Sequence, residues 1–232
     1  MKVIIHGTGV MSSILKEVIE KDGEFEITGF ADDFTNEKGD MIIDFSHFSR
    51  LSDMIDYGVK NNIPMVIGTT GYDETMLTKI IEASSHVPIV LSSNTCIGIN
   101  LMNEILAKLA PQLRNFDIEI IETHHNRKVD SPSGTAKSLY NIINDALDNE
   151  MSFVNGRSGL HVRDKKEIGI HSLRGGSVIG DHSVIFYGDD EIVEIRHSST
   201  SRRIFANGAI KAAKFLLGKK PGLYRMKDVL SQ

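Results

Sequence analysis

The densest group of chemically useful side chains lies in residues 122–136, which read E-T-H-H-N-R-K-V-D-S-P-S-G-T-A. Basic side chains can pair with an anion, and histidine can also transfer a proton near neutral pH. Four basic or titratable side chains fall within five positions: His124, His125, Arg127 and Lys128. The stretch predicts a site for an acidic substrate, and a solvated basic loop is the alternative.

A predicted helix start follows in the same stretch, at Ser133, Gly134 and Thr135. The first N–H groups of a helix have no intrahelical acceptor and lie at the positive end of its dipole. We expect one carboxylate of a dianionic substrate on these N–H groups, and the other facing the histidines and Lys128. Solvated loops seldom join paired histidines to such a helix start, so we favour the binding site.

A second candidate site lies at residues 7–12, G-T-G-V-M-S, directly after an apolar run at Val3–Ile5. Two glycines allow a tight turn and a close approach of the backbone to a pyrophosphate, and the following helix offers free N–H groups. The expected cofactor residues are Gly7, Thr8, Gly9, Val10, Met11 and Ser12. The third glycine of the usual G-x-G-x-x-G pattern is replaced by Ser12, and an ordinary strand-to-helix turn is the alternative.

An acidic residue is expected about 20 residues after such a turn, where its carboxylate accepts hydrogen bonds from the adenosine ribose. Asp32 lies at the expected end of the second strand, with Asp33 beside it. A carboxylate there repels a 2′-phosphate, and no Arg or Lys is adjacent. We therefore expect NADH to be favoured over NADPH, with a solvated turn carboxylate as the alternative.

Two further loops follow expected strands of the same sheet and read G-T-T-G at 68–71 and S-S-N-T at 92–95. Open α/β sheets bind ligands at the carboxyl ends of their strands, and small residues there let a flat nicotinamide ring lie close to the backbone. The expected cofactor residues are Gly68, Thr69, Thr70, Ser92, Ser93, Asn94 and Thr95. We expect no metal ion.

Short apolar runs alternate with helical patterns through the first half of the chain. The expected strands are 3–5, 27–31, 41–45, 64–68 and 87–91, and the expected helices include 11–21, 74–84 and 98–112. Strands without polar alternation, each followed by a helix, indicate a parallel sheet covered on both faces. The prediction is an α/β fold with a Rossmann-like, doubly wound parallel sheet.

The pattern changes after residue 112. A strand at 117–123 contains acidic residues, and the helix after it begins at 131–135. Further strands at 167–171, 177–187 and 191–197 are separated by glycine turns, which predicts a second, α+β domain with a mixed sheet. A last helix is expected at roughly 206–217, beginning near Asn207-Gly208.

The composition excludes some partners. The 232 residues include 26 Lys and Arg against 31 Asp and Glu, a formal charge of −5, whereas nucleic-acid-binding proteins are usually basic. Cys96 is the only cysteine, which fits a reducing compartment. The N-terminal apolar run is too short for a signal peptide, and no stretch approaches the length of a membrane span. We expect a cytoplasmic protein without nucleic-acid or membrane partners.

The sequence resembles the 4-hydroxy-tetrahydrodipicolinate reductase family, also called dihydrodipicolinate reductase, over essentially the whole chain. The most specific piece is E-x-H-H-N-x-K-V-D-x-P-S-G-T at 122–135. The supporting pieces are D-F-S at 44–46, G-T-T-G at 68–71, S-x-N-x-x-x-G-x-N at 92–100, R-G-G at 174–176 and F-A-N-G-A at 205–209.

The resemblance implies NAD(P)H-dependent reduction of a cyclic dicarboxylate in lysine biosynthesis through diaminopimelate. It implies a dinucleotide-binding domain at 1–95 plus 207–232, and a domain at 96–206 that binds substrate and builds a homotetramer. His124 and Lys128 would be the catalytic acid/base groups, with His125, Gly134 and Thr135 contacting the substrate. Many members have a glycine turn that is one residue longer, G-x-G-G-x-M-G.

Two other functions stay open on the residues alone. One is another Rossmann-type NAD(P)-dependent dehydrogenase, acting on a hydroxy or amino acid, and the other is a non-catalytic NAD(H)-sensing protein. Fold does not separate these functions. The paired histidines with Lys128 favour an enzyme, because a sensor needs no acid beside the nicotinamide.

Overall fold

The chain folds into two compact units. The computed structural model describes residues 1–31 and 38–231. The first unit comprises Met1–Ile97 and Arg202–Gln232, and the second comprises Gly98–Ser201. Each unit is built on a sheet of its own.

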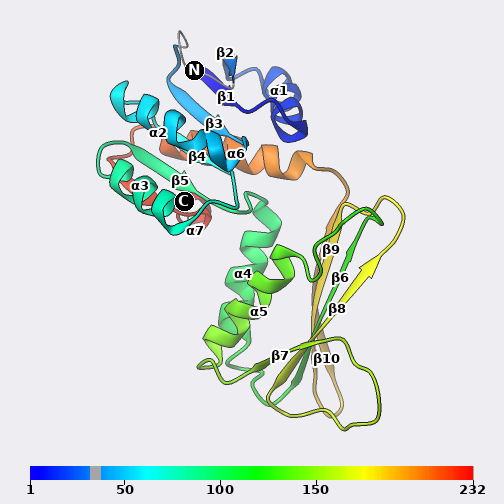
Figure 1. Ribbon diagram of the computed structural model, residues 1–232. Helices are drawn as coiled ribbons and strands as arrows, with labels where there is room; N and C mark the ends of the chain where they lie inside the picture. Colours follow the sequence, from blue (N-terminus) through cyan, green and yellow to red (C-terminus); the bar gives the residue numbers. More distant parts are fainter. Residues whose placement is uncertain (32–37, 232) are drawn as a thin grey trace. The chain divides into compact units, whose positions relative to one another are not determined.

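The first unit contains a six-stranded parallel sheet with the order β11-β5-β4-β3-β1-β2 (Figure 1). The strands are β1 (Lys2–His6), β2 (Glu26–Ala31), β3 (Met41–Asp44), β4 (Met65–Ile67), β5 (Pro88–Leu91) and β11 (Gly222–Tyr224). Strands β3, β4 and β5 are buried at every residue. Such strands need apolar side chains on both faces, which explains why they appear as continuous apolar runs.

Helices cover both faces of this sheet. They are α1 (Val10–Asp22), α2 (Leu51–Lys60) after the short 3₁₀ turn Phe48–Arg50, α3 (Glu74–Ser84), α6 (Arg203–Leu216) and α7 (Met226–Leu230). Val3 and Ile5 pack in one core with residues of α1, α6 and α7, whereas Ile4 packs in the other with residues of α2 and α3. The predicted Rossmann-like fold class is confirmed.

Helix α6 begins at Arg203, so the prediction that it begins near Asn207-Gly208 is wrong. Gly208 lies inside the helix, where a Cβ atom would come 1.7 Å from the carbonyl oxygen of Thr95. The hydroxyl of Thr95 also donates a hydrogen bond to the carbonyl of Phe205 at 2.7 Å. Gly208 therefore allows the helix to pack directly on the loop after β5, and does not mark a helix end.

The second unit contains a five-stranded mixed sheet with the order β10-β9-β6-β8-β7 (Figure 1). Its strands are β6 (Asp117–His124), β7 (Ser152–Asn155), β8 (Glu167–Arg174), β9 (Gly180–Tyr187) and β10 (Ile192–Ser199). Strand β6 is parallel to β8 and antiparallel to β9. Helices α4 (Ile97–Leu109) and α5 (Gly134–Ala146) cover one face of this sheet (Figure 1). The predicted second domain with a mixed sheet is confirmed.

Three short elements were not predicted. Strands β7 and β11 have four and three residues, and helix α7 has five. Elements of this length contain too few residues for a periodic pattern, and neighbouring strands determine where they form. Among the described residues, no helix has the length and apolar character that crossing a membrane requires.

Candidate active site

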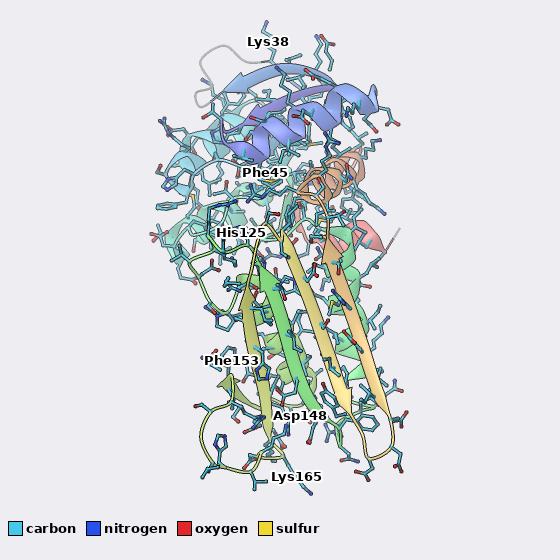
Figure 2. The ribbon with its side chains drawn as sticks, turned by 90° about the vertical axis from the view of Figure 1, so that its right-hand side faces the viewer. Lys38, Phe45, His125, Asp148, Phe153 and Lys165 are labelled. Atoms are coloured by element: carbon cyan, nitrogen blue, oxygen red, sulfur yellow. The ribbon has the colours of Figure 1, made fainter. Side chains whose placement is uncertain are left out.

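Strand β6 carries His124 at its carboxyl end. Buried side chains alternate along the strand, and they are Ile118, Ile120, Glu122 and His124. The two isoleucines anchor the strand in the core, so the same buried face then presents a carboxylate and an imidazole two residues apart. Figure 2 shows the next residue, His125, at the end of the long strands remote from Asp148 and Lys165.

Glu122 is fully buried and accepts hydrogen bonds at both carboxylate oxygens. Oε2 accepts from His124 Nδ1 at 2.5 Å and from Arg174 Nη1 at 2.9 Å. Oε1 accepts from Arg174 Nη2 at 2.9 Å and from the backbone N–H of Ser133 at 3.2 Å. Arg174 reaches this position because the register of β6 and β8 pairs it with His124.

The hydrogen bonds determine the charge of Glu122. Burial by itself raises the pKa of Glu122, but hydrogen bonds from Arg174, His124 and the Ser133 N–H outweigh burial and lower it to about 2. Glu122 is therefore an ionised carboxylate at neutral pH and can only accept hydrogen bonds.

His182 lies beside His124 and was not predicted as a site residue. The two rings meet edge to face with centroids 5.2 Å apart, and His182 Nε2 lies 3.2 Å from Ser133 Oγ. Burial, and next the charge of His124, lower the pKa of His182 to about 4. His182 is therefore neutral at physiological pH and adds no positive charge beside His124.

The loop after β6 carries Lys128. Its ammonium donates to both carboxylate oxygens of Asp130, at 2.7 and 2.9 Å. This hydrogen bond lowers the pKa of Asp130. The carbonyl of Asp130 in turn accepts from Arg174 Nη2 at 2.8 Å. Lys128 is thus connected to His124 through Asp130, Arg174 and Glu122.

Helix α5 begins at Gly134, next to this loop. Ser133 is its N-cap and accepts a hydrogen bond from the N–H of Ala136 at 3.2 Å. Gly134 is exposed, Thr135 is half-buried, and the first turn contains no acidic side chain. The N–H groups at this helix start can therefore donate hydrogen bonds to an anion. The structure brings together His124 and the predicted substrate residue Ser133, because both bond to Glu122.

The glycine turn of the first unit fits a pyrophosphate. Gly7 has φ +106°, and a Cβ there would come 2.8 Å from the Phe45 carbonyl oxygen, so only glycine is suited to the turn. Gly9 is the N-cap of α1 and no side chain caps this helix. The predicted residues Thr8 and Val10 are exposed, while Met11 is half-buried and Ser12 is buried behind the turn.

A cavity of about 490 Å³ lies at this turn. It is lined by residues 7–9 and by a second segment, Phe45, Ser46, His47, Ser49 and Arg50. This second segment is not among the cofactor residues predicted from the sequence. Its position directly after β3, at the carboxyl edge of the sheet, could have indicated it.

The other predicted cofactor residues lie at the same sheet edge, and several of their side chains already have partners. Gly68 packs against Phe45, and the Thr69 hydroxyl donates to the Ser46 carbonyl at 3.0 Å. The hydroxyl of Ser92 donates to the Asn94 carbonyl at 2.8 Å. Thr70 and Ser93 are exposed, and Thr95 is buried. Asp32 lies outside the described residues.

A buried polar pair at this edge was also missed. His6 Nδ1 and Asp44 Oδ1 are 2.9 Å apart, and both side chains are fully buried. They end neighbouring parallel strands and are partners in the register of β1 and β3. The pair links the strand end before the glycine turn to the strand end before the second segment that lines the cavity.

The parallel sheet, its glycine turn and the second mixed sheet define the class of protein, which is a Rossmann-type dinucleotide-binding fold joined to a second unit with a mixed sheet. Two family models match the chain in succession. The model of the dihydrodipicolinate reductase N-terminus matches residues 1–95, and that of its C-terminus matches residues 98–230. The chain belongs to the dihydrodipicolinate reductase family.

Individual relatives agree with this family. The chain is 87% identical over 231 residues to 4-hydroxy-tetrahydrodipicolinate reductase of Brachyspira hyodysenteriae, with 100% of each chain covered. It is 43% identical over 246 residues to the enzyme of that name from Clostridium novyi, covering 99% of this chain and 98% of the relative. A dipicolinate-bound dihydrodipicolinate reductase from Paenisporosarcina sp. TG-14 has the same fold, with a TM-score of 0.82, 22% identity and 99% of both chains covered. The predicted family and enzyme class are confirmed.

Proposed function

We propose that this enzyme reduces 4-hydroxy-tetrahydrodipicolinate to tetrahydrodipicolinate with NADH or NADPH, in lysine biosynthesis through diaminopimelate. The observation that carries the proposal is the 87% identity, over the full length of both chains, to a reductase named for this substrate. The described geometry supports it, because a dianion-binding helix start and two basic side chains are connected through one buried carboxylate.

The cofactor supplies a hydride when it is bound. The start of α1 and the turn at Gly7 and Gly9 would hold its pyrophosphate, since that helix has neither a side-chain cap nor an acid in its first turn. Arg50 and His47, which line the same cavity, would offset the negative charge of the phosphates. The loops at Gly68–Thr70 and Ser92–Thr95 would contact the nicotinamide end.

The substrate is a dianion. The N–H groups of Gly134 and Thr135 would bind one carboxylate, and His125 and Lys128 would face the other. Lys128 is held in place by Asp130, yet an ammonium has three N–H donors, so it can keep that partner and still contact the substrate.

The remaining step is protonation of the ring. The 4-hydroxyl group must leave as water, with a proton lost from the adjacent ring carbon, to give the conjugated C=C–C=N system. Hydride addition to this system leaves an enamine anion, and its ring carbon must gain a proton from a positioned acid. We assign this transfer to His124 and Lys128. His124 bonds to Glu122 through Nδ1, so Nε2 is the atom available to exchange a proton.

NADH is the proposed preferred cofactor, because the sequence has acidic residues, Asp32 and Asp33, about 20 residues after the glycine turn, where a carboxylate disfavours a 2′-phosphate. Asp32→Ala should weaken NADH binding and spare or improve NADPH binding, measured by fluorescence titration of each cofactor. Tighter binding of NADPH by the wild type, unchanged in the variant, would show that Asp32 does not contact the ribose.

Homotetramer assembly is also proposed. The face of the second sheet opposite α4 and α5 exposes large apolar side chains, namely Leu173, Tyr187 and Ile192. Burial of such side chains between copies is favourable. A cytoplasmic location fits the single cysteine and the use of NAD(P)H. Light scattering at micromolar concentration should give the mass of four chains, and a monomer would contradict the assembly.

The activity is tested by following NADH oxidation with the preceding synthase of the pathway in the same cuvette. Oxidation should depend on the product of that synthase. A panel of hydroxy and amino acids with NAD⁺ tests the alternative dehydrogenase. Turnover of a panel member, without oxidation of NADH in the coupled assay, would favour the alternative.

A further inference from the structure

Two charged side chains in the second unit, Glu122 and Arg174, lie beside the proposed catalytic residues and do not themselves transfer a proton in the mechanism above. Glu122 is fully buried, and Arg174 is only partly exposed. A buried carboxylate is costly unless it is well hydrogen-bonded, so its presence in a core needs a reason.

The carboxylate joins two parts of the proposed site. Oε2 accepts from His124, and Oε1 accepts from the N–H of Ser133 at the start of α5. The two N–H groups of Arg174 bridge the same two oxygens and balance their charge. One side chain therefore holds both the proton donor and the helix start that receives a substrate carboxylate.

We propose that Glu122 is a positioning residue for this reaction, with Arg174 as its counter-ion, and that it fixes the orientation and tautomer of His124. The inference deepens the proposed function and rests on its assignment of His124. Glu122 does not touch the substrate and acts through His124.

The tautomer follows from the hydrogen bond. An ionised carboxylate can only accept, so Nδ1 of His124 keeps its hydrogen in both protonation states of the ring. The exchangeable proton is then on Nε2. The charged and titratable groups that face this ring from the elements packed against it are Glu122 on β6, Arg174 on β8 and His182 on β9.

Gly180 supports the same geometry. A Cβ at this position of β9 would come 3.0 Å from Nε2 of His124 and 3.4 Å from Cδ2. The absence of a side chain leaves space at the nitrogen that exchanges the proton.

Arg174 keeps the pair in this state. Without its two N–H donors, burial would favour the protonated form of Glu122, whose O–H could donate to Nδ1 and move the imidazole hydrogen to Nε2. Arg174 also holds the carbonyl of Asp130, the residue that pairs with Lys128. It is therefore a positioning residue for both proposed acids.

The test is Glu122→Gln, which keeps the shape of the side chain and removes its charge. We expect kcat to fall by about 10–100-fold or more, since carboxylates that orient metal-bound imidazoles are worth about that much. NADH affinity should be unchanged, and KM for the substrate should change less than kcat. The pH–rate profile should also change, because the amide no longer fixes the imidazole tautomer.

Two readouts separate positioning from a merely structural role. The first readout is the ¹⁵N NMR spectrum of the imidazoles, in which the His124 signal is assigned as the one missing from His124→Asn. This signal should show the Nδ1–H tautomer in the wild type and shift towards the Nε2–H tautomer in Glu122→Gln. Glu122→Gln should also cost little further kcat in the His124→Asn background, because it acts through that ring. The spectrum needs no substrate, so it tests the inference even if the enzyme acts on another compound.

Glu119→Gln is the matched control. Glu119 lies on the same strand and also binds a histidine and two arginines, His171, Arg157 and Arg163, but on the opposite face of the sheet. The kcat of the Glu119→Gln enzyme should stay near the wild-type value, and its His124 ¹⁵N signal should not move. If Glu122→Gln does not fold, Glu122→Asp keeps the charge and should retain the Nδ1–H tautomer.

An unchanged His124 tautomer in Glu122→Gln would overturn the proposal. Full additivity of Glu122→Gln and His124→Asn in kcat would overturn it too, as would an Nε2–H tautomer in the wild type or in Glu122→Asp.

Discussion

The contact between helix α6 and the loop after β5 leads to a quantitative prediction for Gly208→Ala. The new Cβ would lie 1.7 Å from the Thr95 carbonyl oxygen, whereas ordinary C···O contacts are about 3.3 Å or longer. The helix and the loop must then separate by roughly 1.5 Å. Both sides of this contact are backbone, so no side-chain rotation can relieve it.

Two effects of opposite sign compete in this variant. Alanine is better than glycine in a helix by about 0.8–1.0 kcal/mol. Overpacking costs about 1–3 kcal/mol, and loss of the Thr95–Phe205 hydrogen bond adds about 0.5–1.5 kcal/mol. Because rigid backbone places the packing cost in the upper half of its range, we expect a net destabilisation of about 2–3 kcal/mol. For a chain of this size that corresponds to a melting temperature lower by roughly 4–12 °C.

Thermal unfolding followed by circular dichroism measures this change. Asn207→Ala is the control, because this exposed neighbour on the same helix changes helix propensity without a clash. It should melt at or above the wild-type temperature. Thr95 belongs to the proposed cofactor loop, so Gly208→Ala should also bind NADH more weakly. A Gly208→Ala protein that melts at or above the wild type would refute the packing argument.

Three further predictions concern the proposed site. Lys128→Ala should lower kcat by about 10²–10⁴-fold, or roughly 3–5 kcal/mol of transition-state stabilisation, with NADH affinity near wild type. The kcat of the variant is measured by steady-state kinetics under conditions where hydride transfer is shown to be rate-limiting. A normal kcat would mean that Lys128 acts only as a charge that binds the substrate. Pyridine-2,6-dicarboxylate should inhibit competitively with the substrate, because it presents two carboxylates on an unreducible ring. Competition with NADH instead would place the dianion site elsewhere. Folding lowers the pKa of His182 from its ordinary value of 6.5 to about 4. The contribution of the neutral ring to stability is therefore complete above pH 6.5, and it is lost as the pH falls from 6.5 towards 4. Unfolding by urea should therefore show a smaller loss of stability over this range in His182→Asn than in the wild type.

The parts of the fold that local pattern determines could be predicted from the sequence. Residues 41–44 and 88–91 are buried on both faces, and this requirement leaves an apolar run that indicates a strand. Gly208 shows the limit of such patterns. Asn207-Gly208 has the composition of a helix boundary, but the reason for the glycine lies more than one hundred residues away, at Thr95.

The candidate site could be predicted to a similar extent. His124, Lys128 and the helix start at Ser133 are close in sequence, so their types and spacing indicate a site. Arg174 bonds to Glu122 across 52 residues, and only the register of β6 and β8 brings them together. His182 reaches Ser133 from a third strand, 49 residues away. Partners of this kind depend on strand pairing, which local patterns do not specify.

The return of the chain to its first unit has a consequence for synthesis on the ribosome. The core on one side of the first sheet needs residues of α6 and α7, among them Ala209, Phe215 and Val229. Until these residues leave the exit tunnel, the apolar face formed by Val3, Ile5 and their neighbours has the cover of α1 but lacks the part that α6 and α7 supply. The second unit is continuous in sequence and can complete its core first. The nascent chain should therefore fold from the middle outwards, and its amino-terminal half should be the part that chaperones protect.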